Sequence, residues 1–371
     1  MTVLFAILIF LAVLFVLVLV HEWGHYITAK LTGMRVDEFG IGFPPTLWSK
    51  KVGETTYALN SLPIGGYVKI LGEDGEEGMS ALSEEDKTRT FGARPKWAQA
   101  LVLFAGVTMN MLLAWLFLII ISISMIGGER PILEEDYTDD ARLIVAEVLA
   151  DSPAQGVVPV GAQVLAISTE DVSSPEILTP TSFSSIVTQA QDTPVTVTYE
   201  HNGEVQSATI QAKARTLEGE ERLLLGVSLA LVAPVEYGLF TAIAEGTLAT
   251  IDLTKRVAVG IFTFFGDIFT GNADFSTVAG PVGIVGHVGD AAQQGFIQLL
   301  FFTALISINL AVINLLPIPA LDGGRLVLVA VETVIRRPLS PRLAGKVNLI
   351  GFLFLIGVMV AVTVSDIWKF F

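Results

Sequence analysis

The first long apolar stretch of the chain ends in a cluster of ionisable residues. Val3 to Val20 is an 18-residue run without a charged side chain. As an α-helix it is about 27 Å long at ~1.5 Å per residue, close to the thickness of the hydrocarbon core of a bilayer. It is followed at once by His21-Glu22-Trp23-Gly24-His25. Because ionisable side chains in a membrane span are costly, they usually have partners and a function. The run therefore predicts a polar site at a membrane helix.

The spacing of these residues is typical of a zinc site. On a helix, His21 and His25 lie one turn apart on the same face and can bind a single Zn²⁺, while Glu22 is placed to take a proton from metal-bound water. Two surface histidines on an ordinary helix are the alternative. The chain has only four histidines and no cysteine, so a zinc ion must use His, Asp or Glu side chains. The motif predicts two ligands and a general base, and a third ligand must come from elsewhere.

The composition favours an integral membrane protein. Apolar residues make up 52% and charged residues 16% of the 371 residues, and the mean hydropathy is +0.65, which is too apolar for an ordinary soluble domain. The net charge of −15 argues against nucleic acid as a partner. Met1 and Thr2 carry no positive side chain and no A-x-A-like site precedes the motif. We therefore expect the first segment to be a retained span rather than a signal peptide.

Four segments are long and apolar enough to cross a membrane. They are residues 1–31, 97–126, 296–316 and 347–368. The loop 32–96 and the loop after residue 317 are rich in Lys and Arg, whereas the connection from Gly127 to Glu236 has five Lys and Arg against eighteen Asp and Glu. By the positive-inside rule, the basic loops are cytoplasmic, and the acidic connection and the N-terminus lie outside.

Residues 237–266 decide whether this topology can assemble a site. The segment is apolar but carries Glu245, Asp252, Lys255 and Arg256, which predicts an amphipathic helix lying in the membrane interface. If it does not cross the membrane, the end of the first span and the loop after the third span lie on the same side. If it crosses, they lie on opposite sides.

The connections between the spans predict β-structure. Within residues 32–96, strand-like alternation from Thr46 to Lys69 surrounds a Gly53-Glu54 turn. This is either a small cytoplasmic sheet or a hairpin that dips towards the site, which requires its backbone to be buried in protein or to line a cavity. Residues 140–231 contain short apolar runs, an Asn202-Gly203 turn and one helical segment, typical of a compact β-rich binding domain.

Residues 317–324 supply the candidate third ligand. Pro317 and Pro319 break the helix of the third span, so the carboxylate of Asp322 can point back towards the helices. A polar turn that leaves the membrane is the alternative. If residues 237–266 do not cross the membrane, Asp322 can join His21 and His25, and the fourth zinc position stays open for water. Asn314 then either orients substrate or helps to stabilise the oxyanion. An interhelical hydrogen bond is the alternative.

Taken together, these segments resemble the site-2 protease family of intramembrane zinc metalloproteases, and within it the bacterial regulator-of-sigma-E protease type. The resemblance covers most of the chain. It rests on residues 21–25, on Asn314 to Gly323 and on Gly280-Pro281-Val282-Gly283-Ile284. It implies a polytopic α-helical membrane protein with four transmembrane helices, a membrane-associated β-hairpin region and one inserted β-rich PDZ-like domain. It also implies one catalytic Zn²⁺, with Glu22 as general base.

The resemblance further implies cleavage of transmembrane helices. Phe39 to Lys69 is similar to a membrane-re-entrant β-loop, in which Tyr57, Tyr67 and Val68 would position the unwound substrate as an added strand. Expected partners are the lipid bilayer and single-span membrane proteins, for example an anti-sigma factor, or signal-peptide remnants. The PDZ-like domain would bind a peptide or a substrate ectodomain, or act as a size filter. The expected location is the bacterial plasma (inner) membrane, with the N-terminus and the PDZ-like domain extracytoplasmic and the active site toward the cytoplasm.

Two other functions fit parts of the sequence. A membrane scaffold or pseudoprotease would bind zinc without turnover, but zinc binding alone does not need Glu22. A metal transporter would need a continuous polar path, and the four spans contain few polar residues.

Overall fold

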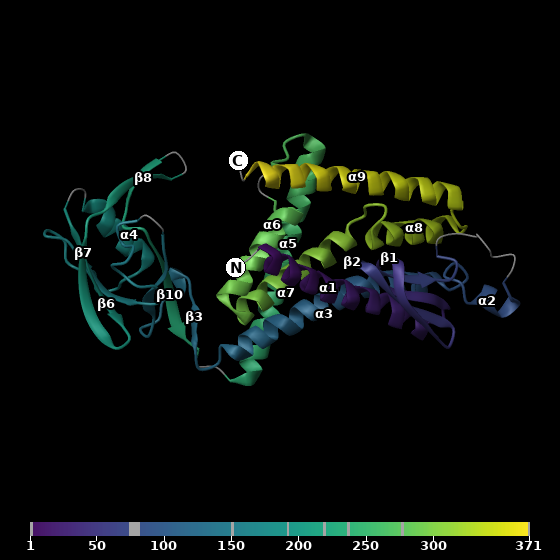
Figure 1. Cartoon of the computed structure of the whole chain (residues 1–371), viewed down its shortest axis with the longest axis horizontal. Helices are drawn as coiled ribbons and strands as arrows, with labels where there is room; N and C mark the ends of the chain where they lie inside the picture. Colours follow the sequence, from purple (N-terminus) through teal and green to yellow (C-terminus); the bar gives the residue numbers. More distant parts are fainter. Residues whose placement is uncertain are drawn as a thin grey trace. The chain divides into compact units, whose positions relative to one another are not determined.

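The chain folds as two compact units. The computed structural model describes residues 3–73, 82–149, 152–190, 193–217, 220–235, 238–275 and 278–369. One unit, the helical unit, is formed by Met1–Ser122 together with Ala242–Phe371, and the other, the β unit, is formed by Ile123–Thr241. The elements of both units are labelled in Figure 1.

The helical unit contains the helices that are long and apolar enough to cross a membrane. In the described part of the chain there are four: α1 (Val3–Leu31), α3 (Lys96–Ser124), α7 (Phe296–Leu315) and α9 (Pro341–Trp368). In the most apolar 18-residue window, 39% of residues are buried in α3 and in α7, against 17% in α1 and 11% in α9. The helices α3 and α7 are therefore the interior pair, and α1 and α9 expose apolar side chains in the way expected of lipid-facing helices.

Several ends of these helices differ from the sequence prediction. The last helix begins at Pro341 rather than at residue 347, because the Ser340 hydroxyl accepts a hydrogen bond from the Leu343 N–H and proline suits the first helical position. The second helix ends at Ser124 rather than at residue 126.

Small side chains let the interior helices pack closely. Ala114 and Leu118 of α3 meet Ala304 and Ile308 of α7 in one buried cluster. The helix α5 (Leu239–Thr270) includes most of the segment predicted to be amphipathic. Its 32 residues are long enough to cross a membrane, but it is not one of the candidate spans, which combine length with high hydropathy and few charged residues. At Gly246 it approaches α3 so closely that an added Cβ would lie 2.7 Å from the Ile119 Cα.

Three further helices complete the helical unit. They are α2 (Glu84–Thr88), α6 (Pro281–Gln294) and α8 (Asp322–Ile335). His287 lies on α6 with its ring centroid 6.1 Å from that of Phe302. The Gly-Pro-Val-Gly segment at the start of α6 is capped by α9, because the Asp366 carboxylate accepts a hydrogen bond from the Gly283 N–H at 2.8 Å.

A long hairpin follows α1. Its strands are β1 (Val36–Val52) and β2 (Thr55–Ile70), with a turn at Gly53-Glu54. Both strands are far longer than the short alternating runs in the sequence, because each folds back on itself. The first part of β1 lies between two parts of β2, so Phe39 pairs with both Val68 and Tyr57. This gives a small sheet with Gly66 to Ile70 along one edge and Thr46 to Val52 along the other.

Aromatic side chains hold this sheet on α1. The Tyr26 and Tyr57 hydroxyls are 2.6 Å apart, and the Phe39 ring lies against Tyr26 and Trp23. At the turn, Glu54 pairs with Lys30 at the end of α1 (2.5 Å) and with Arg89 (2.8 Å). The sheet is therefore fixed to the helix that carries the histidine motif, as Figure 1 shows for β1, β2 and α1.

The β unit is built on a six-stranded sheet with the order β3-β10-β4-β5-β6-β7. The strands are β3 (Glu129–Pro131), β4 (Arg142–Val148), β5 (Gln163–Ser168), β6 (Val195–His201), β7 (Glu204–Ile210) and β10 (Val227–Pro234). A separate ladder joins β8 (Lys213–Leu217) to β9 (Glu220–Leu224). One helix, α4 (Pro180–Gln189), buries Phe183, Ile186 and Val187 in the core of the unit. Asn202 and Gly203, predicted as a turn, both have positive φ between β6 and β7.

Candidate metal centre

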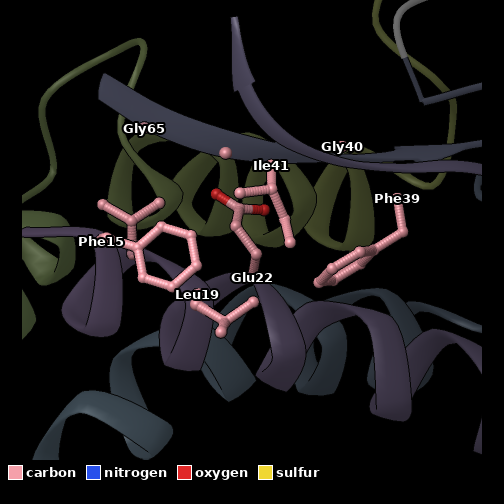
Figure 2. Close-up of a pocket in the computed structure, with 9 residues that line it drawn as sticks. Phe15, Leu19, Glu22, Phe39, Gly40, Ile41 and Gly65 are labelled. Atoms are coloured by element: carbon pink, nitrogen blue, oxygen red, sulfur yellow. The ribbon is translucent and has the colours of Figure 1, made fainter. Parts of the chain in front are cut away.

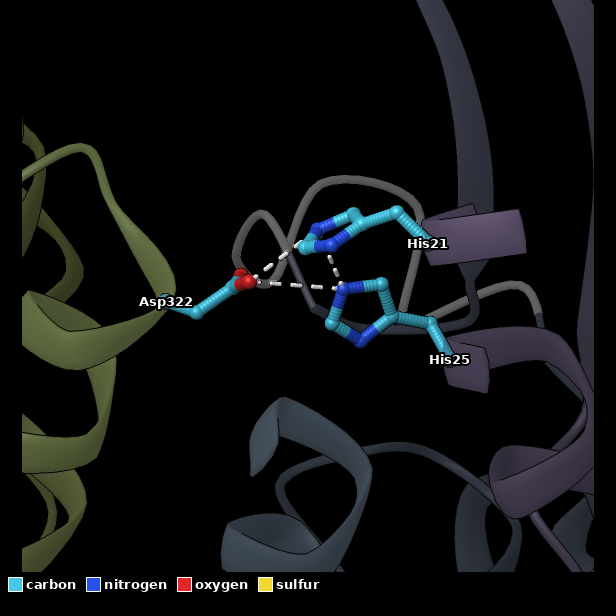
Figure 3. Close-up of side chains that lie close together, drawn as sticks. All are labelled: His21, His25 and Asp322. Atoms are coloured by element: carbon cyan, nitrogen blue, oxygen red, sulfur yellow. Dashed lines mark hydrogen bonds and ion pairs between the residues drawn. The ribbon is translucent and has the colours of Figure 1, made fainter. Parts of the chain in front are cut away.

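The structure brings His21, His25 and Asp322 together. The Nε2 atoms of the two histidines are 3.1 Å apart, and the Asp322 Oδ2 lies 3.2 Å from His21 Nε2 and 3.4 Å from His25 Nε2. Figure 3 shows the three side chains pointing at a common centre from two separate helices. Donors that bind a tetrahedral Zn²⁺ at about 2.0–2.1 Å are about 3.3–3.4 Å from one another. The donor set and its spacing therefore fit zinc.

One stripe of α3 shapes the histidine side of this cluster. At Gly106 an added Cβ would lie 2.3 Å from His25 Nε2 and 2.6 Å from His21 Cε1. On the α1 side, a Cβ at Gly24 would lie 2.5 Å from the Ala105 carbonyl oxygen. Such distances are far inside van der Waals contact, so both glycines are required for the two helices to pack with the imidazoles between them.

Hydrogen bonds to α3 fix the orientation of both rings. His25 Nδ1 lies 2.8 Å from the Val102 carbonyl oxygen. Because a carbonyl only accepts, Nδ1 carries the proton and the lone pair of Nε2 is free for a metal ion. Val102 and Gly106 are four residues apart, as are Gly106 and Asn110, so three contacts to the histidines come from one face of α3.

Asn110 is a site residue that the sequence did not reveal. Its side-chain amide lies 3.3 Å from His21 Nδ1, and its backbone carbonyl accepts a hydrogen bond from Ser307 of α7 at 2.7 Å. Asn110 is 1% exposed, and within the described chain its Oδ1 has no hydrogen-bond partner. The amide orientation that turns Oδ1 towards His21 satisfies both groups, since Oδ1 then accepts the Nδ1 proton. A polar residue inside a predicted span, four positions after a glycine, was the available signal.

Asp322 is the first residue of α8 and follows the break predicted at the two prolines. The chain turns sharply here: a Cβ at Gly323 would lie 2.3 Å from the Leu316 carbonyl oxygen, and one at Gly324 would lie 2.2 Å from that of Ile318. Asp322 Oδ2 is buried and faces the Nε2 atoms of the two imidazoles, and no hydrogen-bond partner is found for it in the described residues. A buried carboxylate oxygen of this kind is suited to a cation.

Ion pairs hold α8 against the rest of the helical unit. One turn after Asp322, the Arg325 guanidinium pairs with Glu73, which follows β2. Further along α8, Glu332 pairs with Lys96 at the start of α3 at 2.6 Å. These contacts place the start of α8 opposite the histidines.

Glu22 faces the hairpin from the same helix that carries the two histidines. Its carboxylate lies in a small pocket between α1 and the sheet, with Phe15 and Phe39 to either side in Figure 2. Gly66 of β2 comes so close that an added Cβ would be 3.2 Å from Glu22 Cγ. The base candidate therefore borders both the two histidines of its own helix and the edge of the sheet.

The other predicted site residues do not all lie at the metal centre. Val68 lies on the sheet edge beside Glu22 and pairs with Phe39. The Tyr57 hydroxyl is hydrogen-bonded to Tyr26 of α1, whereas the Tyr67 hydroxyl donates to Glu38 within the sheet at 2.7 Å. Asn314 lies at the end of α7, and no hydrogen bond joins it to the trio or to another helix in the described chain. Its two predicted roles stay predictions.

The site contains two histidines one turn apart, a carboxylate from a distant segment and an adjacent glutamate. The described part of the chain that carries it has four candidate membrane helices. Together these features define a membrane metallohydrolase. The model of the peptidase family M50 matches residues 9–358, and the chain belongs to this family. The resemblance to site-2 proteases is thereby confirmed.

Relatives from several bacteria align along the whole chain. It is 37% identical to "Putative zinc metalloprotease CPE1693" of Clostridium perfringens over 369 residues, covering 99% of this chain and 98% of the relative. It is 29% identical to "Zinc metalloprotease RasP" of Geobacillus kaustophilus over 434 residues, covering 98% and 97%. The RasP of Shouchella clausii is also 29% identical, with 98% of both chains covered. The protein is a membrane zinc metalloprotease, and zinc is its cofactor.

Proposed function

We propose that this protease hydrolyses peptide bonds within or next to the transmembrane helices of membrane substrates. His21, His25 and Asp322 hold the zinc ion, and Glu22 is the general base. The observation that carries the proposal is the convergence of three donor atoms, 3.1–3.4 Å apart, at the end of a helix apolar enough to cross a bilayer.

The residues around the centre divide the chemical work. Bound zinc supplies a Lewis acid that lowers the pKa of water and polarises the scissile carbonyl. Glu22 accepts the proton of the attacking water and delivers it to the leaving amine. His25 and His21 are held in one tautomer by Val102 and Asn110. Asn314 is kept as a candidate for orienting substrate or stabilising the oxyanion.

Substrate would be held by the edge of the small sheet. A peptide bond in a helix is shielded by its own hydrogen bonds, so the substrate must be unwound locally before water can attack it. The edge that contains Val68 runs beside Glu22, and an extended segment can add to such an edge by main-chain hydrogen bonds. Tyr57 lies in an inner row, between Phe39 and Lys50. Val68→Pro should therefore impair cleavage directly, whereas Tyr57→Pro should disturb the sheet itself.

The membrane orientation follows from the loop charges. The β unit, with its excess of acidic residues, and the N-terminus are extracytoplasmic, and the metal centre lies toward the cytoplasmic side of a bacterial plasma membrane. In this topology α5 lies in the interface. Reporter fusions after residues 232 and 290 should then report the same side, and opposite sides would contradict the topology.

The β unit is proposed to be PDZ-like and to bind a peptide or substrate ectodomain, or to exclude large ectodomains from the entrance. Its six-stranded sheet and the helix α4 support a compact binding domain. Substrates in this proposal are single-span proteins such as an anti-sigma factor, or signal-peptide remnants. Membrane proteins that co-purify with an inactive variant would identify them.

Glu22→Gln tests the proposal. The variant should keep its zinc, because Glu22 is not a ligand, and lose cleavage of a single-span substrate. Wild-type protein with zinc and without cleavage of any membrane substrate would favour a scaffold or pseudoprotease. Turnover by Glu22→Gln would refute the role of Glu22 as general base.

A further inference from the structure

The apolar pocket beside Glu22 takes no part in holding zinc. Its α1 wall is formed by Phe15, Val18 and Leu19, which precede Glu22 by seven, four and three residues and so lie on one face of the helix. The opposite wall is Phe39 and Ile41 of β1 with the glycine backbone of β2. Among the described residues that line it, Glu22 is the charged one, and Figure 2 shows its carboxylate between the two walls.

The dimensions of this pocket suit a single small side chain. Its volume is about 10 Å³, close to the ~10–15 Å³ that one water molecule needs and far below the roughly 300–1,000 Å³ of pockets that hold whole small molecules. The backbone of Gly66 closes one side. A Cβ at this position would lie 3.2 Å from both Glu22 Cγ and Val18 Cγ1, so one methyl group there would occupy much of the free space.

Because Glu22 is the proposed general base, the pocket that it lines lies next to the scissile bond. A general base acts within about 2.6–3.2 Å of the proton it takes, so the water that attacks the substrate carbonyl must lie beside the Glu22 carboxylate. In an extended peptide, successive side chains point to opposite faces. One of the two residues that flank the scissile bond must therefore direct its side chain towards the wall from which Glu22 projects.

We propose that this pocket receives the side chain of a substrate residue that flanks the scissile bond, and that it admits only small uncharged side chains. The inference rests on the proposed function, because it takes Glu22 as the base. Phe15, Leu19 and Phe39 leave no room for a long or aromatic side chain. An acidic side chain would meet the Glu22 carboxylate, and any charged one would lose its hydration among apolar walls.

The experiment uses the full-length, zinc-loaded protein and a model transmembrane peptide whose cleavage position is first located by mass spectrometry. Gly, Ala, Leu, Phe or Asp is then placed on each side of that bond. At one of the two positions, the wild type should cleave the Gly and Ala peptides at least about tenfold faster than the others, because one methylene in an apolar pocket changes specificity by about 10- to 200-fold.

Three variants change the size of the pocket in opposite directions. Phe15→Ala and Leu19→Ala should raise the rate on the Leu and Phe peptides relative to Ala by about tenfold. Gly66→Ala should lower the rate on Ala relative to Gly. Val16→Ala is the matched control: Val16 is 39% exposed on another face of α1, and its loss should leave the ratios unchanged. Zinc content reports whether each variant is folded. Because there are three independent variants, the test can still be made if one of them does not fold.

Two results would overturn the inference. One is a wild type that cleaves the Phe peptide as fast as the Gly peptide at both positions. The other is an unchanged set of ratios in every variant that binds zinc. In both cases cleavage itself continues, so the proposed function stands and only the pocket assignment falls. If the zinc-loaded wild type cleaves no peptide of the series, the proposed function falls and the pocket assignment falls with it.

Discussion

The two halves of the metal centre are held in place by different forces. The histidine half lies where α1 packs against α3 with no space to spare at Gly24 and Gly106. The aspartate half begins a helix that follows a proline-containing turn, and that helix is tied to its surroundings by the ion pairs Arg325–Glu73 and Lys96–Glu332. Of these side chains, Arg325 is 28% and Lys96 34% exposed.

This difference predicts unequal tolerance to change. Overpacking a tightly packed contact costs typically ~1–3 kcal/mol and moves neighbouring groups, whereas partly exposed ion pairs contribute ~0–1 kcal/mol. Substitutions in the histidine half should therefore disturb zinc binding more than substitutions that break the ion pairs of the aspartate half.

The largest effect is expected for Gly106→Ala. The added methyl would lie 2.3 Å from His25 Nε2, so either the imidazoles or α3 must move, and zinc binding should be lost. Gly357→Ala on α9 is the control, because nothing lies within 4 Å of the Cβ it adds. The measurement is zinc per chain after dialysis against a weak chelator. Equal zinc content in the two variants would contradict the close packing described for the histidine half.

Asn110→Leu should have the next largest effect. Partners that orient metal-binding histidines typically contribute about 10- to 100-fold to metal affinity, and the loss of the amide leaves His21 Nδ1 without its partner. Asn309→Leu is a matched control, since in the described part of the chain the Asn309 amide bonds to the Leu305 carbonyl of its own helix. Competition with a fluorescent zinc chelator measures both affinities. An Asn110→Leu affinity equal to that of Asn309→Leu would remove Asn110 from the site.

Breaking the ion pair of α8 should weaken zinc binding about tenfold, at the lower end of the effects of residues that orient a ligand. Arg325→Glu places two acidic groups together at the pair with Glu73. The double variant Arg325→Glu with Glu73→Arg restores opposite charges and should recover most of the affinity. If the double variant is no better than Arg325→Glu alone, the pair does not position Asp322.

The smallest effect is expected for the ion pairs at the hairpin turn. The hydrogen bonds from Arg89 and then Lys30 lower the pKa of Glu54 from its ordinary 4.5 to about 2. Ionised Glu54 therefore stabilises the fold above pH 4.5, and this stabilisation is lost as the pH falls from 4.5 towards 2. The melting temperature of the wild type should exceed that of Glu54→Gln at pH 6, and the difference should shrink by pH 3. A difference that grows on acidification would contradict this sign.

The residues of the metal centre that could be predicted from the sequence are those whose positions depend on helix geometry or on the order of the membrane spans. The positions of His21 and His25 follow from helical spacing. Asp322 was inferred from the proline break together with the hypothesis that residues 237–266 do not cross the membrane. The roles of Asn110, Gly106 and Val102 could not be predicted. They depend on which face of α3 meets α1, and two helices that are apolar all round carry no periodic signal of that contact.

The hairpin also has a feature that could not be predicted from the sequence. Its turn at Gly53-Glu54 was readable, but the doubled register that places Phe39 between Val68 and Tyr57 was not. Pairing between segments distant in sequence depends on how the strands fold back, which alternation alone does not encode. The predicted positioning role of Tyr57 and Tyr67 rested on their sequence position, and the structure shows that their hydroxyls bond to Tyr26 and Glu38.

Zinc X-ray absorption of the wild type and of Asp322→Ala tests most directly whether the two halves meet on one ion. The wild-type spectrum should show two imidazole nitrogens and a carboxylate oxygen at about 2.0–2.2 Å. In Asp322→Ala the carboxylate contribution should disappear and the zinc content should fall. A wild-type spectrum with a single imidazole, or a spectrum unchanged by the loss of Asp322, would contradict the assignment of these three residues as ligands.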